Sequence, residues 1–273
     1  SPLYILDERT VRDMCRQFLT EFKTRYENTV VLYAAKAFIN PALAKLFQDE
    51  GLGMDVVSGG ELAVAIAVDF VQENIYFHGN NKTPAELNMA LDNQTGTIVV
   101  DNLDELRLLN ELAGRKNKLQ KIMLRVSPSV DPHTHVKTTT GTLDSKFGLS
   151  IQNGQATQAL LEALDMVNLD LAGLHFHLGS PIYELEPYST AIDIVLNFAK
   201  KFETNGFELR EFSPGGGFAI AYTHDKPPPL ISSYADTITS SVITSCRNLN
   251  LVEPKIVIES GRALIGRSGV ALY

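Results

Sequence analysis

The chain has 273 residues, of which 44% are hydrophobic and 21% charged, a balance typical of a globular protein with a sizeable core. Its formal net charge of -8 argues against a nucleic acid partner, which would call for a basic surface. No apolar stretch is long enough to cross a bilayer and no signal peptide opens the chain, so we expect no membrane association.

The two cysteines, Cys15 and Cys246, predict neither a disulfide framework nor a metal cluster. This usage fits a reducing cytoplasm, although a plastid protein that has lost its transit peptide would have the same pattern. Cys15 falls on the apolar face of the first amphipathic stretch, where we expect a buried small hydrophobic residue.

Short β-rich runs alternate with amphipathic stretches along the whole chain. Apolar side chains on one face of residues 11–22 predict a helix, and the capping boxes at 58–61 and 83–86 predict two helix starts. The predicted strands lie at residues 30–35, 54–57, 75–78, 97–100, 121–126, 171–177, 211–213 and 255–258.

About eight β/α units in a chain of this size predict a (β/α)8 barrel. A doubly wound sheet is the alternative, but the glycine-rich nucleotide motif that usually follows its first strand is absent. Residues 127–150 are polar and predict a functional loop after the fifth strand. Residues 224–229 end in three prolines and predict an extended surface segment. No linker divides the chain, so we expect one domain over residues 1–273.

The functional residues of such a barrel lie at the carboxyl ends of its strands. Lys36 ends the first, apolar run, where a desolvated ammonium loses its proton easily, as a Schiff-base lysine requires. The alternative is a lysine that extends into solvent. The other polar side chains at strand ends are Asp55, Ser58, His78, Asn80, Asp101, Arg125, His177, Ser180, Glu259 and Arg262.

The glycine run 215–217 follows the seventh strand, after which barrels often bind phosphate; a tight turn is the simpler alternative. His175 and His177 share one face of the sixth strand, which suits metal ligation, stacking on a planar cofactor or a hydrogen-bonded core pair. We predict no metal, because a barrel hydrolase usually carries this pair on its first strand. Glu259 could hold a pyridine nitrogen and Arg262 could clamp a carboxylate or phosphate, unless the two pair with each other.

Seven strings spread over nearly the whole chain carry a family resemblance. They are residues 33–37 (YAAKA), 55–62 (DVVSGGEL), 78–82 (HGNNK), 145–148 (SKFG), 175–180 (HFHLGS), 215–217 (GGG) and 259–262 (ESGR). In this order they resemble the fold-type III pyridoxal-phosphate decarboxylases, and within them the diaminopimelate branch. The resemblance implies a barrel of the alanine racemase type that binds pyridoxal 5'-phosphate.

The resemblance also implies roles for individual residues. Lys36 would carry the cofactor as a Schiff base, His177 would stack on its ring and Glu259 would keep the ring nitrogen protonated, which makes these three the expected catalytic residues. Asp55 and Glu61 would support the ring from behind. The expected phosphate-binding residues are Ser180, Gly215, Gly216, Gly217, Gly261 and Arg262, the last of which is also the candidate for the substrate carboxylate.

The implied reaction is decarboxylation of an amino acid, most closely meso-diaminopimelate to L-lysine. A carboxylate such as Glu259 at the ring nitrogen favours decarboxylation, whereas the related racemases place an arginine there. Residues 137–141 and 178–182 lean towards the diaminopimelate branch, although Pro181 stands where the family more often has glutamine and Ser260 where it usually has proline. A decarboxylase of ornithine, lysine or arginine, a non-catalytic pyridoxal-phosphate barrel and a metal-dependent hydrolase stay open.

The resemblance further implies a second, β-rich domain that supplies a general acid, and a homodimer in which the partner subunit completes each site. No part of the sequence matches that domain. We therefore expect this chain to be either the barrel of a longer decarboxylase, poorly active by itself, or a natural barrel-only protein, and we favour the first.

Overall fold

The computed structural model describes residues 3–131, 147–222 and 227–273. Within them, eight parallel strands form a ring in the order β5-β4-β3-β2-β10-β9-β8-β6, and a β5–β6 pairing closes it. The strands are β2 (Thr29–Ala34), β3 (Gly53–Val56), β4 (Ile75–Phe77), β5 (Thr97–Val100), β6 (Gln120–Ser127), β8 (Leu169–His175), β9 (Glu211–Gly215) and β10 (Lys255–Ser260). The predicted (β/α)8 barrel is confirmed, since a doubly wound sheet would stay open.

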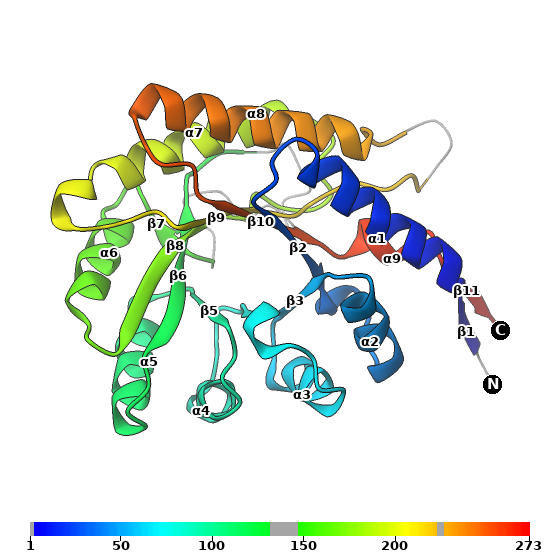
Figure 1. Cartoon of the computed structure of the whole chain (residues 1–273), viewed down its shortest axis with the longest axis horizontal. Coiled ribbons are helices and arrows are strands. Elements are labelled where there is room, and N and C mark those ends of the chain that lie inside the picture. The colour runs from blue at the N-terminus through cyan, green and yellow to red at the C-terminus, as the bar shows by residue number, and fades with distance from the viewer. Residues whose placement is uncertain (1–2, 132–146, 223–226) are drawn as a thin grey trace.

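Helices surround this ring on its outer side (Figure 1). They are α1 (Glu8–Lys23), α2 (Pro41–Asp49), α3 (Gly59–Ala67), α4 (Pro84–Asp92), α5 (Leu103–Arg115), α6 (Gln155–Asp165), α7 (Glu186–Lys200), α8 (Ile231–Leu249) and α9 (Arg262–Ile265). Across the described ranges, no helix is both long and apolar enough to pass through a bilayer.

The sequence signals at the helix starts act much as predicted. Thr83 and Glu86 form the reciprocal capping box of α4, with proline in its first turn. At α3 the Ser58 side chain accepts from the Glu61 backbone N–H, but the Glu61 carboxylate reaches the N–H of Val57 rather than that of Ser58. Cys15 is buried on the inner face of α1, as expected.

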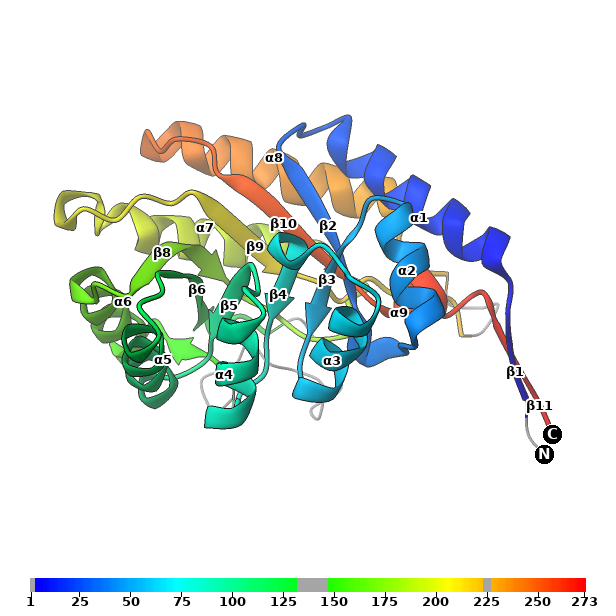
Figure 2. The ribbon, with the colours of Figure 1, turned by 60° about the horizontal axis from the view of Figure 1, so that its bottom comes forward.

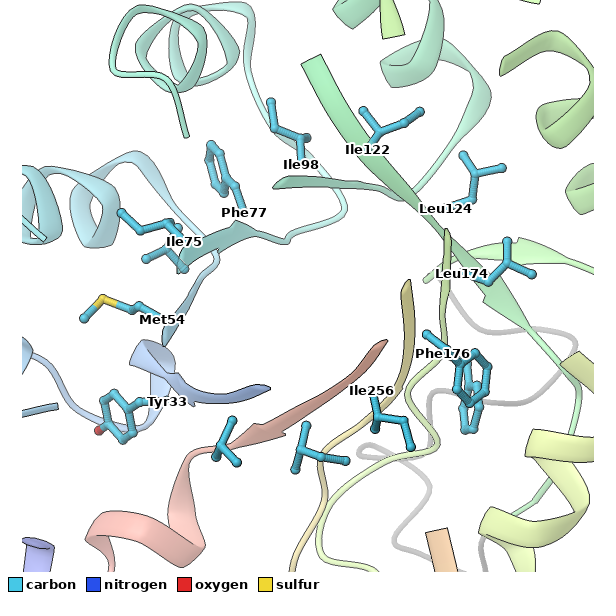
Figure 3. Close-up of a cluster of buried hydrophobic side chains, with 14 of the residues drawn as sticks. Tyr33, Met54, Ile75, Phe77, Ile98, Ile122, Leu124, Leu174, Phe176 and Ile256 are labelled. Carbon is cyan, nitrogen blue, oxygen red and sulfur yellow. The ribbon is translucent and has the colours of Figure 1, made fainter. Parts of the chain in front are cut away.

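Side chains alternate between the two faces of the barrel wall. Figure 3 shows the outward set, including Met54, Phe77 and Leu124, which point from the strands toward the helices and belong to the main core. The inward set forms a separate small cluster inside the ring, made of Leu32, Tyr76, Val99, Met123 and Val257. Because strand side chains repeat every two residues, the next inward position on each strand lies one layer nearer its carboxyl end.

Three short strands were not predicted. β1 (Leu3–Leu6) and β11 (Gly269–Leu272) pair antiparallel and project from the barrel beside α1 (Figure 2). β7 (Leu149–Ser150) adds to the end of β6. The predicted loops are described only in part. Residues 132–146, with the 137–141 segment and the first two residues of the SKFG string, and residues 223–226 lie outside the described residues.

Candidate active site

A polar layer lies above the apolar cluster inside the barrel, at the carboxyl ends of the strands. Its members are the inward positions that follow the apolar ones, and nearly all are buried. They are Asp55 on β3, His78 after β4, Asp101 after β5, Arg125 on β6, His175 on β8, Ser213 on β9 and Glu259 on β10. Two-residue periodicity therefore brings side chains that are distant in sequence into one buried group.

Two adjoining cavities open over this layer. One has a volume of about 280 Å³ and the other about 330 Å³, and Lys36, Asp55, His177 and Glu259 line both. The first is completed by Ser180, Gly216, Gly217, Gly261 and Arg262. The structure thus brings together all the predicted site residues except Gly215, which lines neither cavity, and Glu61, whose carboxylate accepts from the N–H of Val57. The second cavity reaches Asn80, Arg125 and Phe147.

Lys36 differs from its expectation. It lies on a short 3-10 turn, Ala35–Ala37, just past the end of β2, and its side chain is exposed rather than desolvated. The turn carries the amine clear of the strand and into the wall of both cavities. The lysine is therefore accessible from the cavities as well as from solvent.

The glycine run is a place where the backbone passes between two neighbours with no room for side chains. A Cβ on Gly216 would lie 2.1 Å from the carbonyl oxygen of Glu259, and one on Gly217 would lie 2.4 Å from that of Gly179. Gly217 also has a φ of +106°, which favours glycine. The backbone N–H of Gly216 donates to Nδ1 of His177, 3.3 Å away, which fixes this nitrogen as an acceptor.

His175 and His177 face the same side, as predicted, because both line the second cavity, whereas Phe176 between them belongs to the main core. β8 ends at His175, so His177 lies just beyond the strand and lines the first cavity as well. Burial, followed by the charge of Lys36, holds the pKa of His177 well below its usual value. The imidazole of His177 is therefore neutral at physiological pH.

Glu259 is held by side chains from three strands. The Ser213 hydroxyl donates to Oε1 over 2.8 Å, and Nε2 of His175 lies 3.2 Å from Oε1 and 3.3 Å from Oε2. Nε2 of His78 lies 3.4 Å from Oε1. Burial alone would raise the pKa of Glu259, but His175 and His78 outweigh it and hold that pKa well below its ordinary value. The contact between His78 and Glu259 could not be predicted from the sequence, because it depends on the register between strands.

Asp55 behaves in the opposite way. Burial, and next the charge of Glu259, raise the pKa of Asp55 to about 8, so this carboxyl keeps its proton at neutral pH. Its Oδ1 has no hydrogen-bond partner among the described groups. Two buried carboxyl groups in one layer thus take different protonation states, an arrangement common at functional sites.

The remaining contacts involve the two arginines of the site. The possible ion pair between Glu259 and Arg262 is not present among the described residues; the Arg262 guanidinium lies over the ring of Tyr222, 5.6 Å from its centroid. Asp101 contacts Arg125 at 3.4 Å and accepts from the N–H of Gly148. The guanidinium of Arg125 also lies 4.6 Å from the ring centroid of Phe147.

Nε2 or Nδ1 of His78 and His175 and an oxygen of Glu259 all lie within 4.8 Å of one another. This set has the chemistry of metal ligands, but the same contacts also satisfy the Glu259 carboxylate. The absence of a metal stays a prediction.

The cavities bring together an accessible amine, a neutral imidazole, a glycine-lined wall and a buried carboxylate. This combination is typical of a barrel that binds a cofactor. The family model described as "Pyridoxal-dependent decarboxylase, pyridoxal binding domain" matches residues 8–266. The chain belongs to this family, whose cofactor is pyridoxal phosphate.

Several relatives are named diaminopimelate decarboxylase. Those of Bacillus methanolicus and Bacillus subtilis are 40% and 38% identical over all of this chain, which covers 63% and 62% of their lengths. Among solved structures, the diaminopimelate decarboxylase of M. jannaschii has a TM-score of 0.91 at 33% identity, with 98% of this chain and 62% of that one covered. That of Helicobacter pylori complexed with L-lysine has a TM-score of 0.89 at 28% identity, with 98% and 65% covered. The chain thus spans less than two thirds of their length.

The residues present fit the family's cofactor. Side chains are excluded where the glycine run borders the first cavity, which leaves room for a phosphate against the backbone. Asp55 Oδ1 is buried without a hydrogen-bond partner in the described structure, and the Glu259 carboxylate suits the cationic nitrogen of a pyridinium ring.

Proposed function

We propose that this barrel binds pyridoxal phosphate for the decarboxylation of an amino acid, and that the substrate is meso-diaminopimelate and the product L-lysine. The observation that carries the proposal is the convergence of Lys36, His177, Gly216 and Glu259 on one pair of joined cavities. The substrate is supported by relatives at 35 to 40% identity that are named for this reaction.

The phosphate end of the cofactor would lie at the first cavity. The hydroxyl of Ser180, the backbone of Gly216 and Gly217 and the guanidinium of Arg262 line that wall together. Arg262 also begins α9. Backbone amides can bind phosphate without the loss of side-chain entropy that ordering a long side chain requires. Arginine adds charge-assisted hydrogen bonds.

Lys36, His177 and Glu259 would serve the reacting end. The amine of Lys36 lies at the mouth of both cavities and would attach the cofactor covalently. The neutral imidazole of His177, fixed by the N–H of Gly216, presents a flat face to a bound ring. Glu259, which is ionised, would hold a proton on the ring nitrogen. When bound, the protonated pyridine ring draws electrons from the bond to the departing carboxyl group.

The state of Asp55 fits this arrangement. Because Asp55 keeps its proton at neutral pH, Glu259 is the charged carboxyl group of the pair. A neutral Asp55 beside the ring leaves the interaction between Glu259 and the ring nitrogen as the dominant charge contact. Arg125, in the second cavity, offers a fixed positive charge to a substrate carboxylate or a ring oxygen, in addition to Arg262.

The direct test is covalent trapping. The purified protein is mixed with pyridoxal phosphate, reduced with borohydride and mapped by mass spectrometry, with Lys36→Ala as the test variant and Lys45→Ala, an exposed lysine on α2, as the matched control. We expect one labelled residue, Lys36, with labelling lost only in Lys36→Ala. Scattered labelling of several lysines would contradict the proposal.

The substrate is tested separately. A separate sample, loaded with pyridoxal phosphate but not treated with borohydride, is incubated with meso-diaminopimelate, ornithine, lysine or arginine, and the release of carbon dioxide and of the product amine is measured. Lysine formed from meso-diaminopimelate supports the proposal. A labelled Lys36 with no product from any amino acid would instead identify a non-catalytic pyridoxal-phosphate barrel.

We further propose that residues 1–273 form the cofactor-binding domain of a cytoplasmic homodimeric enzyme. The support is the match of the family model to residues 8–266 and the greater length of the relatives. Sedimentation equilibrium of the protein measures its assembly, and a purely monomeric species with full activity would contradict the homodimer.

A further inference from the structure

The two oxygens of the Glu259 carboxylate differ in their number of contacts. Oε1 accepts from Ser213 and lies within 3.2 Å of His175 Nε2 and 3.4 Å of His78 Nε2. Among the described residues, Oε2 contacts His175 Nε2 alone, at 3.3 Å. Since an ionised carboxylate offers about four acceptor positions, Oε1 is crowded and Oε2 keeps an acceptor position open.

His175 contacts both oxygens of this carboxylate. Its Nε2 is almost equidistant from the two oxygens, so it lies near the line that bisects them. Its other nitrogen, Nδ1, is buried with no partner among the described residues. Buried polar atoms are usually satisfied, so a histidine with one nitrogen unsatisfied is better explained by what Nε2 does than by filling space.

His78, which follows β4, contacts the same carboxylate from another part of the ring. Its ring packs edge-on against that of His175, with centroids 4.9 Å apart. The other titratable groups near Glu259 are Asp55, which keeps its proton at neutral pH, and Arg125. Lys36 and the neutral His177 line the same cavities as Glu259. Of all these, His175, His78 and Ser213 have atoms within 3.5 Å of the carboxylate.

We propose that His175, with His78 beside it, is a positioning residue that orients Glu259 so that Oε2 receives the N–H of the cofactor ring. This inference rests on the proposed function, because it assumes that the ring nitrogen meets Glu259. It assigns to the two histidines a task that involves no contact with substrate: they set the direction and the charge of the carboxylate that contacts the ring.

The test compares two substitutions at His175. Glutamine keeps an N–H donor near the position of Nε2, whereas leucine fills a similar space without a donor. We expect His175→Leu to raise the dissociation constant for pyridoxal phosphate about tenfold, a loss typical of removing a partner that orients a liganding side chain. His175→Gln should retain most of the affinity, and His78→Leu should have a smaller effect than His175→Leu. The measurement is titration of the visible absorbance of the bound cofactor.

A double-mutant cycle with Glu259→Gln separates positioning from packing. If His175 acts through Glu259, the leucine substitution should change the dissociation constant less than twofold in the Glu259→Gln background. Tyr76→Phe is the matched control: Tyr76 is buried inside the same barrel on β4 but donates to Glu211, not to Glu259. Its effect on cofactor binding should be absent in both backgrounds.

The outcomes distinguish a failure of the positioning role of His175 from a failure of cofactor binding. Equal losses for leucine and glutamine, or a leucine effect that persists undiminished without Glu259, would overturn the positioning role while leaving cofactor binding by the wild type intact. Wild-type protein that fails to bind pyridoxal phosphate at Lys36 would overturn the proposed function and this inference with it. The proposed function and the positioning role are both supported if His175→Gln keeps most of the cofactor affinity and if His175→Leu has almost no effect in the Glu259→Gln background.

Discussion

Two buried glutamates lie at opposite ends of the barrel interior, and they are satisfied in different ways. Glu211, at the start of β9, contacts the ammonium groups of Lys255 at 2.6 Å and Lys121 at 3.0 Å and accepts from the Tyr76 hydroxyl at 2.8 Å. Glu259, near the end of β10, is surrounded by a hydroxyl and by imidazoles instead. Only the first has full opposite charges in direct contact.

This difference separates a structural carboxylate from one that is ready for a ligand. Burial would raise the pKa of Glu211, but the two lysines and Tyr76 outweigh it and lower the pKa. At the other end, Glu259 adds to the burial that raises the pKa of Asp55 to about 8. A positive group beside Glu259 would pair with this carboxylate as Lys121 and Lys255 pair with Glu211. A protonated pyridine ring is such a group.

The largest effect we expect from this comparison concerns stability at the amino end. Glu211→Ala leaves the Tyr76 hydroxyl buried without its acceptor and removes the shared partner of two lysines. Both lysines are about 30% exposed and can turn to water, so we expect the free energy of unfolding to fall by about 3 kcal/mol. Urea unfolding measures it. The apparent dissociation constant for pyridoxal phosphate should stay within about twofold; a large change would mean that the two ends are coupled.

The next effect concerns the pH dependence of stability at the carboxyl end. In the folded protein Asp55 keeps its proton up to about pH 8, whereas in the unfolded chain it releases it near pH 4. Between these values the folded state binds more protons, so rising pH lowers the free energy of unfolding through this group. We expect Asp55→Asn to remove that loss, so that its advantage over the wild type grows by about 2.5 kcal/mol between pH 5 and pH 7.

The check is urea unfolding of both proteins at several pH values, with the exposed Asp165→Asn as the control. A gap between Asp55→Asn and the wild type that is constant with pH, or that shrinks as pH rises, would show that Asp55 is ionised in the folded protein.

The barrel could be predicted from the sequence because each strand is a short apolar run with a recognisable length and spacing. The polar layer followed from the same reasoning, since residues at strand ends must gather at one end of a parallel barrel. The predicted strand 171–177 has the length of β8 but lies two residues too far along the chain, because nothing in the string HFH marks where ladder pairing stops.

Contacts between strands were beyond the reach of sequence reasoning. Glu211 opens a predicted strand without any local sign of its partners, because Lys121, Lys255 and Tyr76 come from three other strands and meet it only through the register of the closed ring. The same holds for His78 and Glu259. The ribbon of β1 and β11 was missed because its four-residue strands, exposed over most of their length, lack the burial pattern that marks the others.

A smaller stability effect is expected at Glu259. In Glu259→Gln the amide oxygen can still accept from Ser213, and the carboxylate that repels an ionised Asp55 is gone, so we expect the free energy of unfolding to change by less than about 1 kcal/mol. The pH dependence caused by Asp55 should weaken as well, because Glu259 contributes to its raised pKa. Urea unfolding without cofactor tests both; a loss as large as that of Glu211→Ala would remove the contrast between the two glutamates.

The smallest effects should come from the single lysines at the amino end. Lys121→Met and Lys255→Met each leave Glu211 with the other lysine and with Tyr76, so each should lower the free energy of unfolding by about 0.5–1 kcal/mol. Lys255 is the closer partner, whereas Lys121 also lies over the Tyr76 ring, 5.8 Å from its centroid. The double variant leaves a buried carboxylate without any cation and should lose more than the sum of the single losses. An additive double variant would mean that Tyr76 and water satisfy Glu211 without the lysines, and the amino end would then resemble the carboxyl end more than the distances indicate.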